Sequence, residues 1–223
     1  MKIQAIIPAA GLSERMKAQG PKVLLEIAGR PVLVHTLAAF EDCPVVDSVI
    51  LVGHEDSLKD LTALVKAAGL KKISVIVAGG ATRTQSVRNG LKALAKDTDI
   101  VLVHDGARPL VTRKVIEDGI AIAGECGAAV AAVPVKPTLK VVDPRTNLVS
   151  ETLDRTLVWE IQTPQVFRRE IIERAYRGDE NATDDAALVE KSGVPVRVYR
   201  ADYRNIKITT PEDMVIAQAF LRG

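Results

Sequence analysis

Aromatic residues are scarce in this chain. Phe, Trp and Tyr together make up 3% of its 223 residues, so the sequence offers few of the flat side chains on which proteins stack single-stranded nucleic acid. The charged residues do not compensate, because 30 lysines and arginines are balanced by 28 aspartates and glutamates, which leaves a net charge of +2 and no long basic block. We therefore expect no nucleic-acid partner.

Cysteine and histidine are also few. The two cysteines, Cys43 and Cys126, lie in unrelated apolar segments and lack the paired spacing of metal ligands, so we expect reduced thiols in the core. The three histidines show no ligand spacing either, and no Ser-His-Asp order stands out. The sequence gives no support to a disulfide framework, a zinc site or hydrolysis through a covalent nucleophile.

Long apolar runs are absent. No stretch approaches the ~18 uncharged residues that a membrane-spanning helix needs, and the apolar stretch at the beginning is too short for a signal peptide. We expect a cytoplasmic protein that has no membrane partner. The length suits one domain, 1–223, that carries a small embellishment.

What the sequence does contain is an alternation of strand-like and helix-like segments. Five apolar runs rich in β-branched residues suit strands buried on both faces; they are 3–7, 48–52, 73–77, 100–104 and 128–135. The segments between them carry apolar residues at helical spacing, as at Leu58, Leu61 and Leu64. A further strand-like run, 194–199, and a helix that opens at Thr210 follow. This order predicts an α/β fold with a mainly parallel twisted sheet flanked by helices, whose ligands bind at the carboxyl ends of the strands.

A hairpin is predicted after the fifth run. Residues 139–142 and 148–151 can pair across the turn-forming segment 143–147, so we interpret 137–156 as an arm inserted into the domain. An isolated two-stranded ribbon is only marginally stable in water. We therefore expect the arm to pack on another subunit.

The first strand ends in small residues that leave its backbone open. Ala9, Ala10 and Gly11 have little or no side chain, so a ligand can approach the peptide N–H groups. Arg15 and Lys22 bring two cations to the same turn, a combination that suits a triphosphate. The turn lacks the glycines of a Walker loop and of a dinucleotide-binding turn. The alternative interpretation is an ordinary strand-to-helix turn with a solvated arginine.

Asp105 follows the run 100–104 and should lie at the same edge of the sheet. Beside a triphosphate, a carboxylate in this place is well positioned to hold Mg²⁺, which prefers carboxylate and phosphate oxygens. Asp105 is therefore our candidate metal ligand. In the alternative interpretation it caps its own turn and pairs with Arg108.

A glycine pair follows the third run. Gly79 and Gly80 permit the close approach of a flat base or a ribose, Thr82 can cap the next helix, and Ser86 is placed to read the edge of a pyrimidine. A glycine-rich turn with a good helix cap explains the glycines equally well, but it leaves Arg83 without a role.

Two later cations stand near predicted loop or strand ends. Arg155 follows the hairpin and Lys207 precedes the last helix. Both suit a second phosphate, whereas lone charges of this kind are more often solvated surface.

Taken together, these motifs resemble one known family. In chain order they are Pro8–Gly11 with Arg15 and Pro21-Lys22, Gly79-Gly80 with Arg83 and Ser86, His104–Pro109, Thr163-Pro164-Gln165, and Asn205-Ile206-Lys207. The set resembles the 2-C-methyl-D-erythritol 4-phosphate cytidylyltransferases of the non-mevalonate isoprenoid pathway over nearly the whole chain. The first motif is shared with nucleotidyltransferases generally, whereas the joint set in this order is much more specific.

The resemblance implies a single Rossmann-like nucleotidyltransferase domain that uses Mg²⁺ and transfers a cytidylyl group from CTP to the 4-phosphate of methylerythritol. It implies that Arg15 and Lys22 stabilise the transition state and that Arg155 and Lys207 position the acceptor phosphate. The residues that it assigns to CTP are Ala9, Ala10, Gly11, Gly80, Arg83, Ser86, Asp105 and Ala107. Those that it assigns to the acceptor are Arg108, Thr138, Arg155 and Lys207. Family members are homodimers joined through the arm, so Thr138 and Arg155 are expected to act on the neighbouring subunit's site.

Two other functions share parts of this pattern. A cytidylyltransferase for another polyol phosphate, such as ribitol 5-phosphate, would use the same CTP machinery and differ only in its acceptor contacts. A noncatalytic nucleotide-binding protein is the other alternative, but binding alone does not demand Arg15, Lys22 and Asp105 together.

Overall fold

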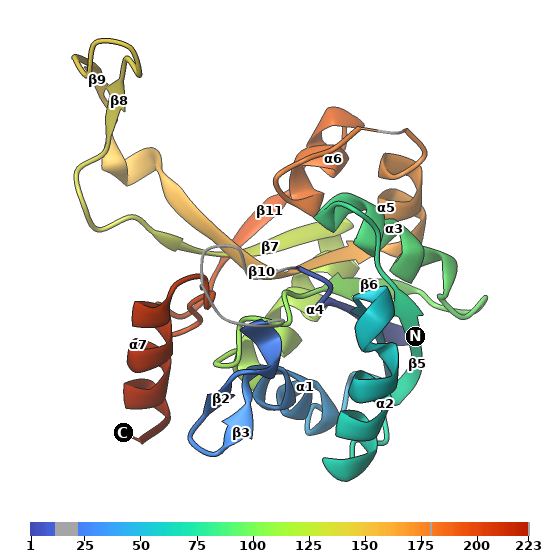
Figure 1. Cartoon of the computed structure of the whole chain (residues 1–223). Helices are drawn as coiled ribbons and strands as arrows, with labels where there is room; N and C mark the ends of the chain where they lie inside the picture. Colours follow the sequence, from blue (N-terminus) through green and yellow to red (C-terminus); the bar gives the residue numbers. More distant parts are fainter. Residues whose placement is uncertain (12–21, 179, 223) are drawn as a thin grey trace.

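The computed structural model describes residues 1–11, 22–178 and 180–222, and a seven-stranded sheet organises them (Figure 1). The strands, in the spatial order β11-β7-β10-β6-β1-β4-β5, are β11 (Arg197–Arg200), β7 (Ala128–Pro134), β10 (Trp159–Arg168), β6 (Ile100–Val103), β1 (Ile3–Pro8), β4 (Ser48–Gly53) and β5 (Ile73–Ala78). All run in one direction except β10, which is antiparallel to both of its neighbours. The predicted α/β fold with a mainly parallel sheet is confirmed.

Strand β10 is the part of the sheet that the apolar pattern did not predict. Its middle holds Gln162, Thr163 and Gln165, which are polar and yet buried. Pro164 also interrupts the run, and proline usually argues against a central strand because it donates no ladder hydrogen bond. Here the register shifts between Ile161 and Gln165, so Pro164 lies in a bulge and needs no ladder partner.

Helices cover both faces of the sheet (Figure 1). They are α1 (Val32–Glu41), α2 (Leu58–Ala67), α3 (Arg83–Lys92), α4 (Arg113–Cys126), α5 (Arg169–Ala175), α6 (Asp185–Lys191) and α7 (Pro211–Arg222), with 3₁₀ helices η2 (Lys22–Leu24), η3 (Glu55–Ser57) and η4 (Arg155–Leu157). One core lies under α1, α2 and α4 and takes in Ile7 and Leu51, whereas the other lies under α3, α5 and α6 and takes in Ile6 and Ile50. Because neighbouring residues of β1 enter opposite cores, this strand is buried on both faces, as the continuous apolar run predicted.

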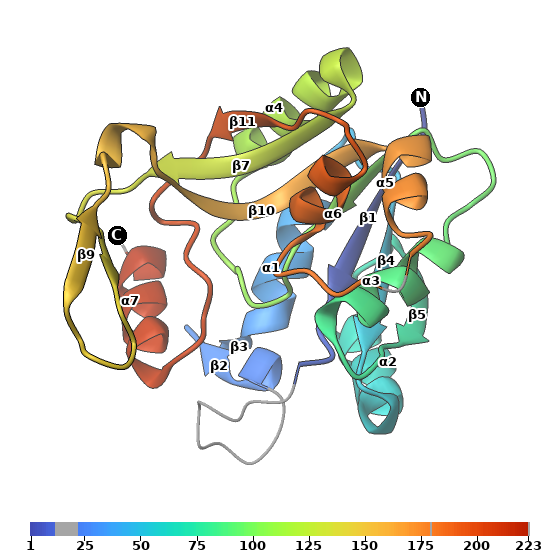
Figure 2. The ribbon, with the colours of Figure 1, turned by 90° about the horizontal axis from the view of Figure 1, so that it is seen from above.

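A third, smaller cluster fastens the end of the chain. Ala217 of α7 and Ile208 pack with Ile27 and Val32, next to the short hairpin of β2 (Glu26–Ile27) and β3 (Arg30–Pro31) (Figure 2). Within the described ranges, no helix has the length and apolar character needed to cross a membrane.

The arm extends away from the body between β7 and β10 (Figures 1 and 2). Its strands β8 (Lys140–Val142) and β9 (Val149–Thr152) pair antiparallel, which confirms the hairpin predicted from 139–142 and 148–151. Every residue of both strands is exposed. The exposed apolar residues include Val141, Val142, Leu148 and Val149.

Helix α3 approaches the sheet closely at Gly90. A Cβ atom there would lie 2.5 Å from Cγ2 of Ile6 and 3.2 Å from Cγ2 of Val52. By contrast, a Cβ atom at Gly124 of α4 would meet nothing within 4 Å. The absence of a side chain at Gly90 therefore sets how close α3 lies to β1 and β4.

Replacing Gly90 by alanine is expected to destabilise the protein by about 1–3 kcal/mol, because overpacking forces Ile6 and Val52 to shift. Gly124→Ala is the matched control, and its higher helix propensity should stabilise the protein by about 0.5–1 kcal/mol. Urea unfolding followed by circular dichroism measures both free energies of unfolding. Equal stability of the two variants would show that α3 can move away from the sheet at no cost.

Candidate functional site

A pocket of about 440 Å³ opens at the carboxyl ends of β1, β4, β5 and β6, the edge where a ligand was expected. Its lining residues are Pro8, Ala9, Ala10, Gly11, Val23, His54, Gly80, Ala81, Thr82, Arg83, Ser86, Asp105, Ala107 and Lys207. Every residue that the sequence assigned to CTP lies among them. The structure thus brings together turns that are separated by nearly the whole length of the chain, from Pro8 to Lys207.

Thr138 and Arg155, two of the other predicted residues, lie apart from this pocket. Arg15 lies outside the described residues, and only the backbone of Lys22, at the start of η2, is described. Thr138 and Arg155 lie at the two roots of the arm, where Arg155 donates from Nη1 to the carbonyl oxygen of Lys136 (2.9 Å). Neither of these two residues lines the pocket of its own chain.

The turn after β5 requires glycine because it packs tightly. A Cβ atom at Gly79 would lie 2.5 Å from Cβ of Ala10 and 2.8 Å from Oγ of Ser86. The Ser86 hydroxyl accepts from the N–H of Gly80 (3.1 Å) and donates to the carbonyl oxygen of Thr82 (3.0 Å), and Thr82 caps α3 as expected. Because its proton is already donated, the Ser86 hydroxyl offers a ligand acceptor capacity only, which suits the amino group of a base.

Asp105 is shared by three cationic side chains. Its Oδ1 accepts from Nε of Arg83 (3.1 Å), its Oδ2 lies 2.9 Å from Nζ of Lys207, and Nε of Arg108 stands 3.6 Å from the same Oδ2. Burial works to raise the pKa of Asp105, but Arg83, Lys207 and Arg108 outweigh it and hold that pKa well below its ordinary value. The carboxylate therefore stays ionised. Asp105 both lines the pocket and lies beside Arg108, so the two interpretations of this residue do not exclude each other.

Among the described residues, the pocket offers a divalent cation one carboxylate, that of Asp105. The same part of the chain holds no group of three His, Cys, Asp or Glu side chains able to bind a metal ion. Both oxygens of Asp105 already meet cationic side chains. Because Mg²⁺ commonly binds through one or two carboxylates together with substrate phosphates and water, this donor set fits an ion that arrives with a triphosphate.

Arg83, the first residue of α3, is held from a second side by residues that the sequence patterns did not single out. Its Nη1 and Nη2 donate to the two oxygens of Asp185 (3.0 and 2.8 Å), and Tyr176 donates its hydroxyl to the same carboxylate. Burial works to lower the pKa of Arg83, but Asp185 and Asp105 raise it above its ordinary value. The available signal was the pair Asp184-Asp185 before an apolar run, which indicates a helix start rather than a site.

His104, which precedes Asp105 in the chain, is buried and neutral. Its Nε2 lies 3.2 Å from the carbonyl oxygen of Arg108, which can only accept, so we place the ring proton on Nε2. Its Nδ1 then accepts from the hydroxyl of Thr163 (3.0 Å), which in turn accepts from the N–H of Asp105 (3.1 Å). Burial lowers the pKa of His104 from 6.5 to about 4. The chain of bonds fixes the turn that carries Asp105.

A second hollow, of about 460 Å³, shares Asp105, Arg83 and Lys207 with the pocket and adds Arg108 and the polar residues of β10. The buried Arg108 donates from Nη1 to the carbonyl oxygen of Asn205 (2.7 Å). The amide of Asn205 donates to the side chain of Gln162 and to the carbonyl oxygen of Thr163 (2.9 and 2.8 Å). The two late sequence motifs therefore meet beside the pocket.

Comparisons with known proteins match this chain to a single enzyme family. Residues 3–223 match the family model described as IspD, 2-C-methyl-D-erythritol 4-phosphate cytidylyltransferase. A relative of that name from Syntrophus aciditrophicus is 46% identical over 226 residues, which cover 99% of this chain and 96% of the relative. Another, from Dehalococcoides mccartyi, is 47% identical over 222 residues, with the same 99% and 96% coverage.

Solved structures share the fold. The crystal structure of 4-diphosphocytidyl-2C-methyl-D-erythritol synthase from Anaerococcus prevotii has a TM-score of 0.87 and 33% identity, and the match covers 100% of this chain and 96% of that one. The 2-C-methyl-D-erythritol 4-phosphate cytidylyltransferase of Thermus thermophilus has a TM-score of 0.80 and 33% identity, with 100% of both chains covered.

Because the fold keeps His104 neutral, stability should fall as the pH decreases. The unfolded chain binds a proton at this residue near pH 6.5 and the folded chain only near pH 4, so the free energy of unfolding should decrease by about 3 kcal/mol across this window. Asp105 does not offset this change, because its lowered pKa affects stability only below the ordinary value of 3.8.

Urea unfolding between pH 7 and pH 4, for the wild type and for His104→Gln, measures this contribution. The other titrating groups are common to both proteins, so the difference between the two curves isolates His104. A difference that does not change with pH would contradict a neutral, buried His104.

Proposed function

The chain belongs to the 2-C-methyl-D-erythritol 4-phosphate cytidylyltransferase family, and we propose that its chemistry takes place over Asp105. It transfers the cytidylyl group of CTP to 2-C-methyl-D-erythritol 4-phosphate and releases pyrophosphate. The observation that supports this site is the meeting of three cationic side chains at one buried carboxylate, beside a backbone that small residues leave open. Two anionic substrates can approach each other only in such surroundings.

CTP is proposed to lie along the turn after β1 and against the glycine turn after β5. The N–H of Ala9 donates to the carbonyl oxygen of Val52 (2.7 Å), so the next N–H groups, of Ala10 and Gly11, are our candidates for the phosphates. Gly80 lets the cytosine approach the backbone, and the acceptor capacity of Ser86, described above, suits the cytosine amino group. Ala107 and Arg83 complete the wall.

The transfer needs no general base. An oxygen of the acceptor phosphate is already anionic and attacks the α-phosphorus in line, while the bond from that phosphorus to the bridging oxygen breaks and pyrophosphate leaves with the electron pair. The main obstacle is the repulsion between anions. We assign Arg15 and Lys22 to the charge that develops on the α-phosphate and pyrophosphate, and Lys207 and Arg155, aided by Arg108, to the acceptor phosphate.

Mg²⁺ is the proposed cofactor, and Asp105 is its protein ligand. When bound, Mg²⁺ would supply positive charge and a template for the phosphate oxygens. The lowered pKa of Asp105 supports this assignment, because the carboxylate is ready to bind a cation at any physiological pH.

We further propose that two chains form a homodimer through the arm, 137–156. The ribbon is exposed on both sides, and Leu157 and Trp159 at its base are 79% and 37% exposed, so a second copy would cover much apolar surface. Thr138 and Arg155 lie outside the pocket of their own chain, and in this dimer they serve the acceptor site of the partner.

The proposed compartment is the cytoplasm. The two cysteines of the chain are both free thiols, Cys43 buried and Cys126 half-buried. Free thiols in this arrangement suit a reducing compartment.

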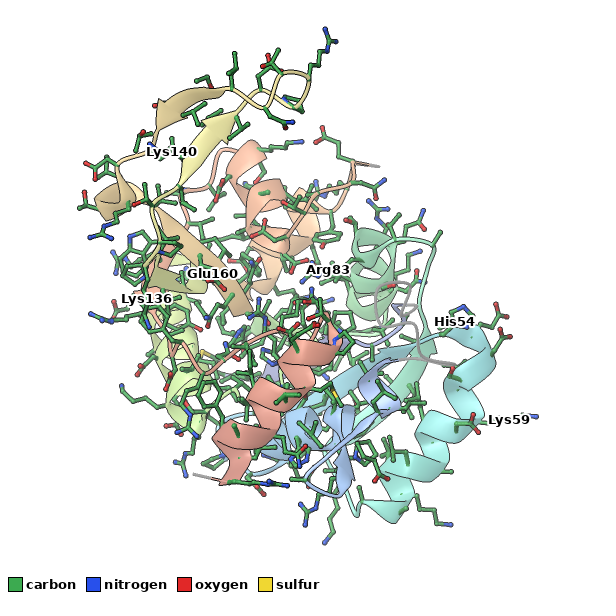
Figure 3. All side chains as sticks on the ribbon, turned by 60° about the vertical axis from the view of Figure 1, so that its left-hand side comes forward. His54, Lys59, Arg83, Lys136, Lys140 and Glu160 are labelled. Atoms are coloured by element: carbon green, nitrogen blue, oxygen red, sulfur yellow. The ribbon has the colours of Figure 1, made fainter. Side chains whose placement is uncertain are left out.

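Pyrophosphate release from CTP tests the site. With Mg²⁺ and methylerythritol 4-phosphate, Lys22→Ala should be slower than the wild type by about 10²–10³-fold, the usual loss when one group that stabilises transition-state charge is removed. Lys59→Ala, an exposed lysine of α2 outside the pocket (Figure 3), is the matched control and should keep the wild-type rate. Ribitol 5-phosphate and a sample without acceptor complete the series. Faster release with ribitol 5-phosphate would contradict the acceptor, and an unchanged rate in Lys22→Ala would contradict the role of that lysine.

Mixing two inactive variants tests the shared site. An Arg155→Ala chain paired with a Lys22→Ala chain has one complete site if Arg155 acts on the partner, so random exchange should restore about a quarter of the wild-type activity. If each chain used its own Arg155, no pairing would restore activity. Size-exclusion chromatography of the mixture confirms that the chains have exchanged.

A further inference from the structure

The guanidinium group of Arg83 serves two carboxylates at once, and it serves them differently. Both oxygens of Asp185 accept from its two Nη atoms (3.0 and 2.8 Å), whereas Asp105 receives only the single N–H of Nε, on Oδ1 (3.1 Å). The side chain of Asp185 is fully buried, and that of Asp105 is 10% exposed. Figure 3 shows Arg83 near the centre of the body, whereas Lys140 marks the distant arm.

This division matters because a guanidinium group prefers to bind a carboxylate with two parallel N–H bonds. An Arg83 that was free of Asp185 would have a second N–H available for Asp105 and would occupy both of its oxygens. Since Asp185 takes Nη1 and Nη2, Arg83 contacts Asp105 at Oδ1 alone. The other oxygen, Oδ2, then faces Nζ of Lys207 at 2.9 Å, with Nε of Arg108 farther away at 3.6 Å.

We propose that Asp185 is a positioning residue of the transfer reaction: it confines Arg83 to a one-point contact with Asp105 and so keeps Oδ2 of Asp105 available to Lys207 and to the cation that accompanies CTP. The inference rests on the proposed function, which places Asp105 and Lys207 at the reacting phosphates.

The surroundings of Asp185 hold it in one orientation. Tyr176 donates its hydroxyl to Oδ1. The backbone N–H groups of Asp185 and Ala186 donate to Oε1 of Gln165 (3.0 and 2.8 Å), which fixes the first turn of α6 against β10. A carboxylate that is bound by Tyr176 and stands on a backbone fixed by Gln165 can orient the arginine that it binds.

A simple attraction model makes the opposite prediction. Arg83, Arg108 and Lys207 with Asp105 and Asp185 carry one net positive charge, and removal of the Asp185 charge leaves two. If charge alone mattered, the loss of Asp185 would strengthen the binding of a triphosphate and leave turnover intact. If positioning matters, turnover falls even where CTP still binds.

The experiment uses Asp185→Asn, which keeps the size of the side chain and removes its charge. We expect kcat to fall about tenfold or more, as misplacement of reacting groups generally causes, while the Kd of CTP with Mg²⁺, measured by calorimetry, stays within about threefold of the wild type or tightens. Ala187→Gly, which weakens α6 without touching Arg83, controls for a structural effect: it should lower the melting temperature and leave kcat unchanged. A wild-type kcat in Asp185→Asn overturns the proposal.

A double-mutant cycle then separates positioning from folding. If Asp185 acts only through Arg83, the addition of Asp185→Asn to Arg83→Gln should change kcat by less than about twofold, because the orienting partner is already lost. An equally large loss in both backgrounds overturns the proposal. Arg83→Lys covers the case in which Asp185→Asn does not fold, because an ammonium cannot serve both carboxylates in this geometry; a folded Arg83→Lys protein with wild-type kcat also overturns it.

Asp105→Asn distinguishes this inference from the proposed function. A wild-type rate in Asp105→Asn would contradict the site itself. Loss of activity in Asp105→Asn together with wild-type turnover in Asp185→Asn would overturn the positioning role alone.

Discussion

The carboxylate of Asp105 carries a negative charge at a place that water hardly reaches, and such a charge is tolerated only when cations and N–H groups surround it. Arg83 comes to it from α3, Arg108 from its own turn and Lys207 from the segment before α7. Three parts of the chain must therefore converge at the end of β6 if the protein is to fold with this residue inside. The same convergence gathers the positive charge that two phosphate-bearing substrates need.

The polar interior extends beyond this carboxylate into the sheet. Gln165 of β10 accepts from two N–H groups at the start of α6, and Thr163 links the backbone of Asp105 to His104. Each of these groups is buried and needs its partner, since an unpaired polar group in the interior is costly. Strand β10, whose middle is polar, thus connects the start of α6 to the turn that carries Asp105.

The sequence was sufficient for whatever is encoded locally. Buried parallel strands such as β1 and β4 appear as continuous apolar runs. The glycine pair after β5 and the small residues after β1 indicate that a ligand can approach the backbone closely. Strand β10 was not predicted, because the buried residues in its middle are polar and form their hydrogen bonds with residues distant in the sequence. The role of Asp185 was not predicted for the same reason. It binds Arg83, which is 102 positions away in the sequence, and no local pattern indicates such a pair. The arm was predictable as a hairpin from its turn-forming residues, and the expectation that it packs on another subunit already implied that it projects from the body.

The arm is the tip of one long hairpin, since β7 and β10 pair directly at its base, Pro134 opposite Trp159. In the described residues, none of the arm's side chains belongs to the buried clusters of the body. For the folding of the body, the arm therefore matters mainly as a loop whose two ends must be brought together. Doubling the length of a flexible loop raises this entropic cost by only about 0.6 kcal/mol. Evolution can lengthen, shorten or resurface the arm, and so change which chains recognise each other, while the catalytic body keeps its stability.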